Sequence, residues 1–259
     1  MATSGPIVRS STNYQQFHNF SVVRSPHSLD CAPMPRLFHL PISPSSRIVR
    51  LVLAEKRREA DLVEERVWER RPDFLAMNPA CEVPVLVDDT DGVIAGSTPI
   101  AEYCEERWPE PPLLAGDARA RAEVRRLVDW FDRKFATEVS DPLVFEKVTK
   151  RFLRIDEGGG APDMAIVRVA LHNLRYHLDY ICYLMETHNW LGGAEMSLAD
   201  LTAAAHLSCL DYVGDVPWGQ YVGAKEWYVR LKSRPSFRGL LADHIPGMPP
   251  PRRYADLDF

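Results

Sequence analysis

A proline-rich break divides the sequence into two regions with different hydrophobic patterns, and it constrains the fold more than any other feature. The break is Trp108-Pro109-Glu110-Pro111-Pro112. Before it, apolar residues follow strand-like and helix-like spacings in turn, and after it they recur at helical spacing throughout. Because proline lacks an amide N–H and has a fixed φ, this run continues neither a helix nor a sheet. The pattern predicts two domains, at 34–107 and 117–245, joined by a linker at 108–116.

Short strands and helices are expected to alternate in the first region. The predicted order is strand, helix, strand, helix, strand, strand, helix, over residues 37–40, 47–53, 61–67, 74–77, 83–89, 93–95 and 97–104. Ser43-Pro44-Ser45-Ser46 supplies capping hydroxyls before the first helix, and Ser97 is expected to cap the last one. This order is that of a thioredoxin-like unit with a mixed sheet.

The second region is expected to be all helical. Two apolar stripes run along its helices: Val124, Leu127, Val128, Phe131 and Phe135, then Val167, Leu171, Leu174, Leu178, Ile181 and Met185. Because His172 and His177 fall off the second stripe, both are expected to face solvent. Trp227 and Tyr228 are expected in or near the core. Ser197-Leu198-Ala199-Asp200 has the pattern of a capping box, which predicts that a helix begins there.

The charge and cysteine content argue against several classes of protein. Lysine and arginine total 31 against 36 acids, a net charge of −5, which argues against a protein that binds nucleic acid. No apolar run approaches the roughly 20 residues of a membrane-spanning helix. The cysteines are scattered, without a CxxC pair or a Cys/His cluster, at Cys31, Cys81, Cys104, Cys182 and Cys209. This pattern favours reduced thiols in a cytoplasmic protein and predicts neither a disulfide framework nor a metal site.

The two ends of the chain differ from the regions between them. Residues 1–33 hold six serines, two arginines and one acid, without the apolar segment of a secretory signal. We expect a disordered leader here; an organellar transit peptide and an over-long translation start, with Met34 as the initiator, are the alternatives. Residues 246–259 form a proline-rich tail in which apolar and acidic side chains alternate near the end. The prolines predict an extended stem.

Several motifs, taken in order, resemble the glutathione S-transferase superfamily over about residues 36–245. They are the Ser-Pro turn from Ser43 to Ser46, Asn78-Pro79 followed by Val83-Pro84-Val85-Leu86, Ser97 with Ile100 and Tyr103, the linker, and the cap from Ser197 to Asp200. The resemblance implies an α/β plus all-α fold, with an N-terminal thioredoxin-like domain and a C-terminal helical domain. It also implies a homodimer.

The resemblance implies where a glutathione site would lie. In the superfamily, the segment equivalent to Val83-Pro84 has a cis proline and presents backbone groups to the cysteinyl part of glutathione. The serine equivalent to Ser97 holds the γ-glutamyl carboxylate. Ser43 stands where serine-dependent members place the hydroxyl that stabilises the glutathione thiolate, and the next two serines of the turn compete for that role. The other interpretation is that all three serines only cap the helix.

Two residues depart from the pattern of active transferases. Gly96 stands where active members carry Glu or Gln beside the γ-glutamyl group, and Glu82 places a negative charge next to an anionic tripeptide. We therefore expect no cofactor, weak or absent glutathione binding, and negligible catalysis. The alternative is a glutathione S-transferase that uses Ser43 to stabilise the thiolate.

A narrower resemblance concerns the transferase-like cell-division proteins of alphaproteobacteria that bind the tubulin-like protein FtsZ. It is carried by residues 156–163, by the segment from Ala224 to Phe237, and by the terminal Asp256-Leu257-Asp258-Phe259. It implies a non-catalytic protein that binds FtsZ filaments, supports constriction at the division site and links the filaments to other division components.

The candidate partner-binding residues lie in two places. Trp68, within an otherwise charged stretch, is either an interface anchor or packed back onto its own domain. Arg70 and Arg71 beside it suit an acidic partner, and with Trp68 they are the predicted FtsZ contacts. The terminal tetrapeptide is the predicted contact for a second division protein, with docking onto the chain's own helical domain as the alternative.

Overall fold

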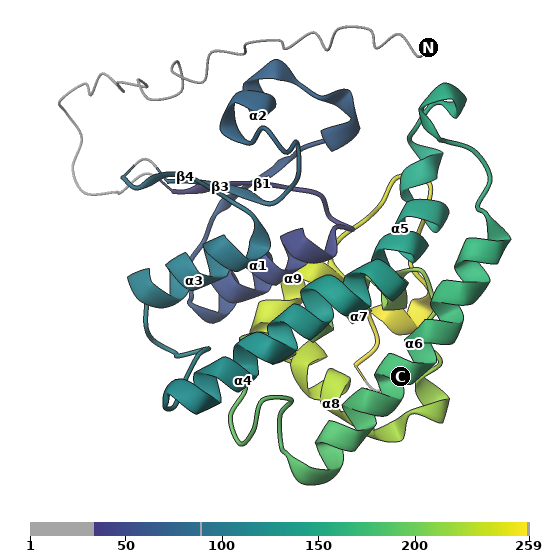
Figure 1. The fold of residues 1–259 in the computed structure, drawn as a ribbon. Helices are drawn as coiled ribbons and strands as arrows, with labels where there is room; N and C mark the ends of the chain where they lie inside the picture. The colour runs from purple at the N-terminus through teal and green to yellow at the C-terminus, as the bar shows by residue number, and fades with distance from the viewer. Residues whose placement is uncertain (1–33, 89, 258–259) are drawn as a thin grey trace, which may run out of the picture. The chain divides into compact units, whose positions relative to one another are not determined.

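The first half of the chain forms a four-stranded mixed sheet with helices on both faces (Figure 1). The computed structural model describes residues 34–88 and 90–257. β1 pairs in parallel with β2 and antiparallel with β3, and β3 pairs antiparallel with β4, so the strand order is β2-β1-β3-β4. The strands are β1 (Arg36–His39), β2 (Asp61–Glu64), β3 (Val85–Asp88) and β4 (Gly92–Ala95).

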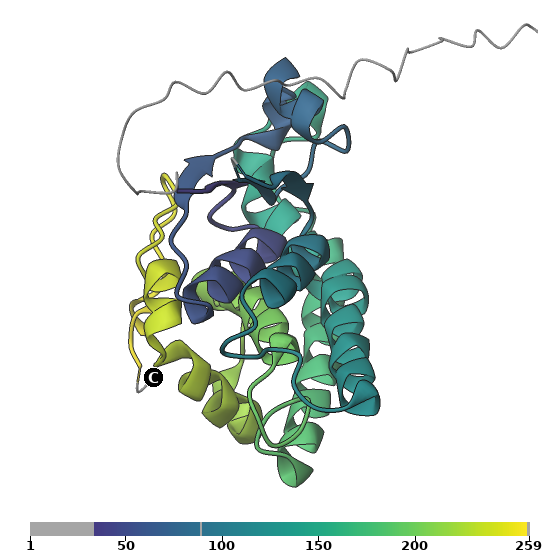
Figure 2. The same cartoon turned by 90° about the vertical axis from the view of Figure 1, so that its left-hand side faces the viewer.

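Three helices cover the sheet. They are α1 (Pro44–Glu55), α2 (Pro72–Met77) and α3 (Ser97–Arg107). Both views show α1 and α3 between the sheet and the second half of the chain, with α2 on the opposite face (Figures 1 and 2). The sheet and its helices confirm the predicted thioredoxin-like domain.

The second half is helical, as predicted. Its α-helices are α4 (Ala118–Asp129), α5 (Asp141–Lys147), α6 (Met164–Thr187), α7 (Leu198–Tyr212), α8 (Val222–Lys232) and α9 (Arg238–Leu241). A π-helical segment, η3 (Trp130–Ser140), joins α4 to α5. Single-turn 3₁₀ segments are η2 (Val67–Glu69), η4 (Thr149–Arg151), η5 (Ile155–Glu157), η6 (Trp218–Gln220), η7 (Pro235–Phe237) and η8 (Arg252–Tyr254). None of the helices in the described residues is long and apolar enough to cross a membrane.

Helix α7 lies at the centre of the helical half. All of its residues are buried, and it packs against α1 of the first domain as well as against α4 and η3. The N–H and the hydroxyl of Ser197 both donate to Asp200 Oδ2, each at 2.9 Å, which confirms the predicted capping box. The carboxylate of Asp200 also accepts from the indole N–H of the buried Trp227, so the cap is tied to α8.

Several predicted boundaries of strands and helices were wrong; strand β3, for example, begins at Val85 rather than at residue 83. Helix α1 begins at Pro44 rather than after Ser46, because the Ser43 side chain accepts from the Ser46 N–H and proline tolerates the first helical position. Strand β2 ends at Glu64, not at residue 67, because the chain turns into η2. Ser97 is the first residue of α3 rather than its cap; Gly96 holds the cap position with φ at 95°, which only glycine adopts without strain.

His177 is buried, contrary to the prediction, whereas His172 is exposed as expected. The Trp130 indole donates to His177 Nδ1 at 3.2 Å, and His177 Nε2 lies 3.0 Å from the carboxylate of Glu138. Both partners come from η3, so the segment that joins α4 to α5 satisfies both ring nitrogens. Burial lowers the pKa of His177. The prediction that Trp227 lies in the core is confirmed, since its side chain is fully buried.

Candidate functional site

A small cavity lies where the two domains meet. Its volume is about 60 Å³. This is room for a few water molecules. The lining residues include Leu40, Pro41 and Ile42 before α1, Trp68 after β2, and Phe152 and Ile245 from the helical domain.

Trp68 stacks on Phe152 across the domain boundary. The ring centroids are 5.9 Å apart, and the ring planes differ by 12°. Trp68 is half-buried, while Phe152 keeps 38% of its surface exposed and Ile155 keeps 87%. The stack holds the indole in one orientation and leaves part of it at the surface. A fixed aromatic side chain of this kind is typical of interface anchors.

The two arginines after Trp68 differ in their surroundings. Arg71 pairs with the buried Glu65, with Nη2–Oε2 at 2.5 Å and Nε–Oε1 at 3.2 Å. Hydrogen bonding to Glu65 raises the pKa of Arg71, so this guanidinium is committed to an internal pair. Arg70 is exposed and has a left-handed backbone conformation, with φ at 46°. Of the two, Arg70 is better placed to meet a partner.

Ser43 lies at the N-terminus of α1 and is half-buried. Its hydroxyl oxygen accepts from the Ser46 N–H at 3.2 Å, and the Ser46 hydroxyl accepts from the Leu40 N–H at 3.2 Å. Both serines therefore hold the turn and the start of the helix. Within the described residues, the Ser43 hydroxyl has no hydrogen-bonded base, so the geometry is that of a cap.

The Val83–Pro84 peptide bond is cis, as predicted. Pro84 is buried, and its carbonyl accepts from the Gly96 N–H at 2.9 Å. Val83 is half-buried and packs against the small apolar cluster on the α2 side of the sheet. The backbone on this side of the sheet thus has the shape that the superfamily resemblance implies.

The Ser97 hydroxyl already has an anionic partner. It donates to Asp132 Oδ2 at 2.8 Å, and Asp132 Oδ1 lies 3.3 Å from His206 Nε2. His206 Nδ1 lies 2.8 Å from the Ser140 hydroxyl, so the tautomer that donates from Nε2 to Asp132 accepts from Ser140 at Nδ1. The group expected to hold a γ-glutamyl carboxylate is therefore bonded to a carboxylate of the same chain.

Asp132 is held in its ionised form. Burial raises the pKa of this carboxyl, but hydrogen bonds from His206, Ser97 and Thr98 outweigh burial, and the pKa stays below its ordinary value. A second carboxylate brought to the Ser97 hydroxyl would meet this charge at close range, and like charges repel strongly in a partly buried site. The arrangement disfavours an anionic ligand at the start of α3.

The tail docks in part onto the helical domain. Tyr254 is fully buried; its hydroxyl donates to the Leu240 carbonyl at 2.9 Å and lies 3.1 Å from Arg47 Nη1. The expected extended stem is therefore interrupted by a docked turn. Asp256 and Leu257 are exposed, and each lines a separate cavity beside α8. Asp258 and Phe259 lie outside the described residues.

The sequence did not point to Phe152 or Asp132. Phe152 follows the apolar Val148 by four residues. This spacing would place both side chains on the same face of a helix, which is only a weak indication that Phe152 contacts another apolar group. Asp132 lies between apolar and charged residues of a helix, where an acid normally indicates a solvated face, and its partner Ser97 is 35 residues away. Only the three-dimensional fold brings together Ser97 at the start of α3, Asp132 of η3 and His206 of α7.

Comparison with known proteins identifies the family of the chain. A model of the glutathione S-transferase N-terminal domain matches residues 42–107. FtsZ-localized protein A of Caulobacter vibrioides is 50% identical over 226 residues, which are 86% of this chain and 97% of that protein. Glutathione S-transferase 3 of Zea mays is 32% identical over 85% of this chain and 98% of its own length.

A solved structure, FzlA from C. crescentus, superposes with a TM-score of 0.83 at 50% identity. The superposition covers 87% of this chain and 100% of the FzlA chain. The similarity extends through both domains, so it includes the sheet, the linker and the helical half. The chain belongs to the glutathione S-transferase superfamily.

Proposed function

We propose that this chain is a non-catalytic cell-division protein that binds FtsZ filaments and supports constriction. The observation that carries the proposal is its 50% identity to a protein named for its localisation to FtsZ, over 97% of that protein's length. From the same similarity we infer that this protein is cytoplasmic and is recruited to the division site.

The Trp68–Phe152 stack is the proposed centre of the FtsZ interface. It joins an aromatic side chain from each domain. Buried aromatic anchors provide much of the binding energy of protein interfaces, while charged residues at the rim provide specificity. Arg70 is the proposed rim cation, whereas Arg71 acts indirectly by holding Glu65.

Two features support the absence of transferase activity. The Ser97 hydroxyl is bonded to Asp132, and Ser43 serves as a helix cap. The first disfavours an anionic ligand because of charge, and the second leaves a glutathione thiolate without an activating group. No cofactor is expected.

The chain is also proposed to form a homodimer through α3 and α4. Arginine and acid side chains alternate on this face, with Arg125 paired to Glu102 at 2.7 Å and Arg133 paired to Asp129 at 2.7 Å. A face that carries both charges can pair with its own copy across a two-fold axis.

Light scattering of the purified chain tests the proposed dimer. The unmodified chain is expected to be a dimer, and the Arg125→Glu/Arg133→Glu variant is expected to be a monomer.

Co-sedimentation with GTP-polymerised FtsZ tests the proposed function. The unmodified chain is expected to pellet with the filaments, and Trp68→Ala is expected to weaken binding at least tenfold, since hot-spot aromatics contribute about 2 kcal/mol or more. Tyr183→Ala on α6 is the matched control, because Tyr183 is an aromatic residue that is 61% exposed. Its binding should be unchanged.

A glutathione-conjugation assay and calorimetry with glutathione complete the test. Tight glutathione binding with turnover, together with no co-sedimentation, would replace the proposal with the transferase alternative based on Ser43. Loss of co-sedimentation in the tyrosine control as well would show that the effect is not specific to the Trp68 surface.

A further inference from the structure

Helix α6 has a second apolar side, which faces outward. Its other side packs into the core of the helical domain. At the margin of that domain (Figure 1), Val169, Tyr176 and Tyr183 recur every seven residues along the outward side, with exposed fractions of 61%, 60% and 61%. Residues seven apart lie on one face of a helix, and two helices that pack side by side use this spacing. The described residues of the chain leave this seam open to solvent.

The charged residues beside the seam are separated by sign. Arg168 and Arg175 lie in the N-terminal half of α6, and Asp179 and Glu186 lie in its C-terminal half. All four residues are exposed, and none of them forms an ion pair or a hydrogen bond within residues 34–88 and 90–257. This holds even for Arg175 and Asp179, which are one helical turn apart and opposite in charge.

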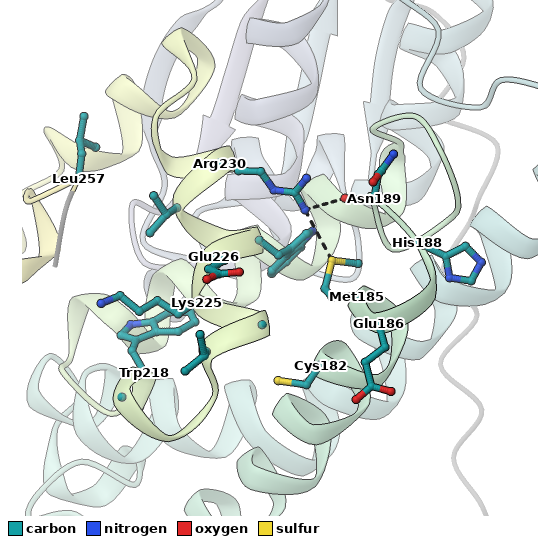
Figure 3. Close-up of a pocket in the computed structure, with 15 residues that line it drawn as sticks. Cys182, Met185, Glu186, His188, Asn189, Trp218, Lys225, Glu226, Arg230 and Leu257 are labelled. Atoms are coloured by element: carbon teal, nitrogen blue, oxygen red, sulfur yellow. Dashed lines mark hydrogen bonds between the residues drawn. The ribbon is translucent and has the colours of Figure 1, made fainter.

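The elements next to α6 leave these charges without an internal partner in the described structure. Figure 3 shows the carboxylate of Glu186 directed away from Arg230 of α8, whose guanidinium donates to the Asn189 carbonyl at 2.6 Å. On the neighbouring α4, by contrast, Arg126 pairs with Glu123 of its own helix at 2.6 Å. The charges beside the seam therefore remain available to a partner outside the chain.

The positions of the four charges suit a helix that pairs with its own copy. Arg168 and Glu186 lie nine residues before and after position 177, and Arg175 and Asp179 lie two residues before and after it. Two copies of α6 that run antiparallel about a two-fold axis at this position place every arginine opposite an acid of the other copy. The two seams then face each other, with Tyr176 next to the axis. A parallel arrangement would instead place like charges opposite each other.

We propose that the outward side of α6 is a docking surface for α6 of a second copy of this chain, packed antiparallel. The apolar seam provides the contact area, and the four charges determine the register and the direction. The contact is separate from the proposed dimer through α3 and α4 and uses none of its residues. A chain with both contacts can form assemblies larger than a dimer.

The contact is a weak one. Stable interfaces bury about 1,200–2,000 Å² in total, and a single pair of helix faces provides less. The dissociation constant is expected to be on the order of 0.1 mM, so the contact is populated only at high protein concentration. At the low micromolar concentrations of a co-sedimentation assay it is absent, and a variant at Tyr183 remains neutral there.

Sedimentation equilibrium from about 10 µM to about 0.5 mM tests the proposal. The Arg125→Glu/Arg133→Glu chain is the starting material, so that the contact through α3 and α4 does not contribute. It is expected to change from monomer to dimer over this range. Adding Arg168→Glu/Arg175→Glu should abolish the change, because all four positions are then acidic. Adding Asp179→Arg/Glu186→Arg should abolish it as well, because all four are then basic.

Mixing the acidic and basic variants distinguishes a specific contact from a folding defect. The equimolar mixture should dimerise at least as well as the starting chain, because every contact again joins opposite charges. Adding Arg151→Glu/Arg238→Glu is the matched control: both arginines are exposed, neither lies on α6, and self-association should be unchanged. Self-association that is absent in the starting chain, or that neither α6 variant reduces, would overturn the proposal. A mixture that stays monomeric would overturn it too.

The seam itself is tested by changes at Tyr176. Tyr176→Ala is expected to weaken self-association about tenfold, because it removes the aromatic ring beside the axis. Tyr176→Phe keeps the ring and should retain the association. Equal dissociation constants for the alanine variant and the starting chain would exclude the α6 seam as the contact.

The α6 contact and the proposed function can fail independently. Self-association through α6 is measured on the purified chain without FtsZ, and loss of FtsZ binding would leave it intact. A dimer through α3 and α4 that is unaffected by changes on α6, together with no further association of the unmodified chain up to about 0.5 mM, would leave only the dimer already proposed.

Discussion

His39 lies at the end of β1 with 5% of its surface exposed, and its Nδ1 has no hydrogen-bond partner among the described residues. Burial lowers the pKa of His39 to about 4, with further lowering by Arg50 and Arg47 that Asp243 partly opposes. Because this pKa lies below the unfolded value of about 6.5, the unfolded state binds the proton more readily. The contribution of the neutral His39 to the free energy of unfolding is therefore complete above pH 6.5 and is lost as the pH falls towards 4.

The free energy of unfolding is therefore expected to depend on pH through His39. Urea titrations at pH 7.5, 6 and 5 should show that His39→Leu flattens the decline in stability, by at most about 3 kcal/mol over the full window. His172→Leu, on the exposed face of α6, is the matched control and should retain the slope of the unmodified chain. Equal slopes for the His39 variant and the unmodified chain would contradict the prediction.

At the scale of elements, Asp132 fastens the start of α3 to η3 and α7 through Ser97 and His206. Asp132→Asn keeps the volume of the side chain but replaces one acceptor oxygen with an amide N–H₂. Either the Ser97 hydroxyl or the His206 Nε2–H would then face a donor instead of an acceptor. An unpaired buried donor costs about 1–3 kcal/mol, and we expect the free energy of unfolding to fall by that amount. Denaturant titration measures it. Asp129→Asn, an exposed acid one turn earlier that pairs with Arg133, should change stability by less than about 1 kcal/mol.

The elements that sequence reasoning located correctly have their causes within a few residues. The capping box at Ser197 and the short helix closed at Asn78-Pro79 depend on side chains close to the backbone they satisfy. The sequence correctly indicates that Ser43 can cap a helix. The predicted start of that helix was wrong, because the pattern of serines does not show which hydroxyl accepts the hydrogen bond from the helix N-terminus. Such errors of a few residues follow from competition between equivalent local donors and acceptors.

The contacts that build the site could not be read from local patterns. Trp68 meets Phe152 and Ser97 meets Asp132 only after two domains pack together, and neither pair shares a periodicity. His177 was misplaced for the same reason: its burial depends on Trp130 and Glu138 of a π-helical segment that no spacing predicts. Hydrophobic periodicity predicts the architecture, whereas the polar partners across the domain interface are determined by three-dimensional packing.

At the scale of the whole molecule, Arg47 joins segments that are far apart in the chain. This fully buried guanidinium donates to the Pro41 carbonyl at 2.7 Å, to the Ser208 hydroxyl of α7 at 2.8 Å, and to the Tyr254 hydroxyl of the tail at 3.1 Å, and it pairs with Asp243 at 3.3 Å. The pKa of Arg47 is raised despite burial, which opposes the charge, because Tyr254, Cys209 and Asp243 favour it. One side chain thus connects the first domain, the central helix and the tail.

We therefore expect the two domains to unfold together and Arg47 to contribute strongly to that cooperativity. Far-UV circular dichroism and tryptophan fluorescence should report one common thermal transition for the unmodified chain. Arg47→Met fills the same space but leaves the acceptors from three segments without their donor, so the expected loss is about 3 kcal/mol, or roughly 6–12 °C in Tm. Arg36→Met, at the exposed start of β1, is the control and should stay within about 0.5 kcal/mol. Two separate transitions in the unmodified chain would mean that the contacts of α1 with α7 and the tail do not couple the domains, and that Arg47 stabilises only its local surroundings.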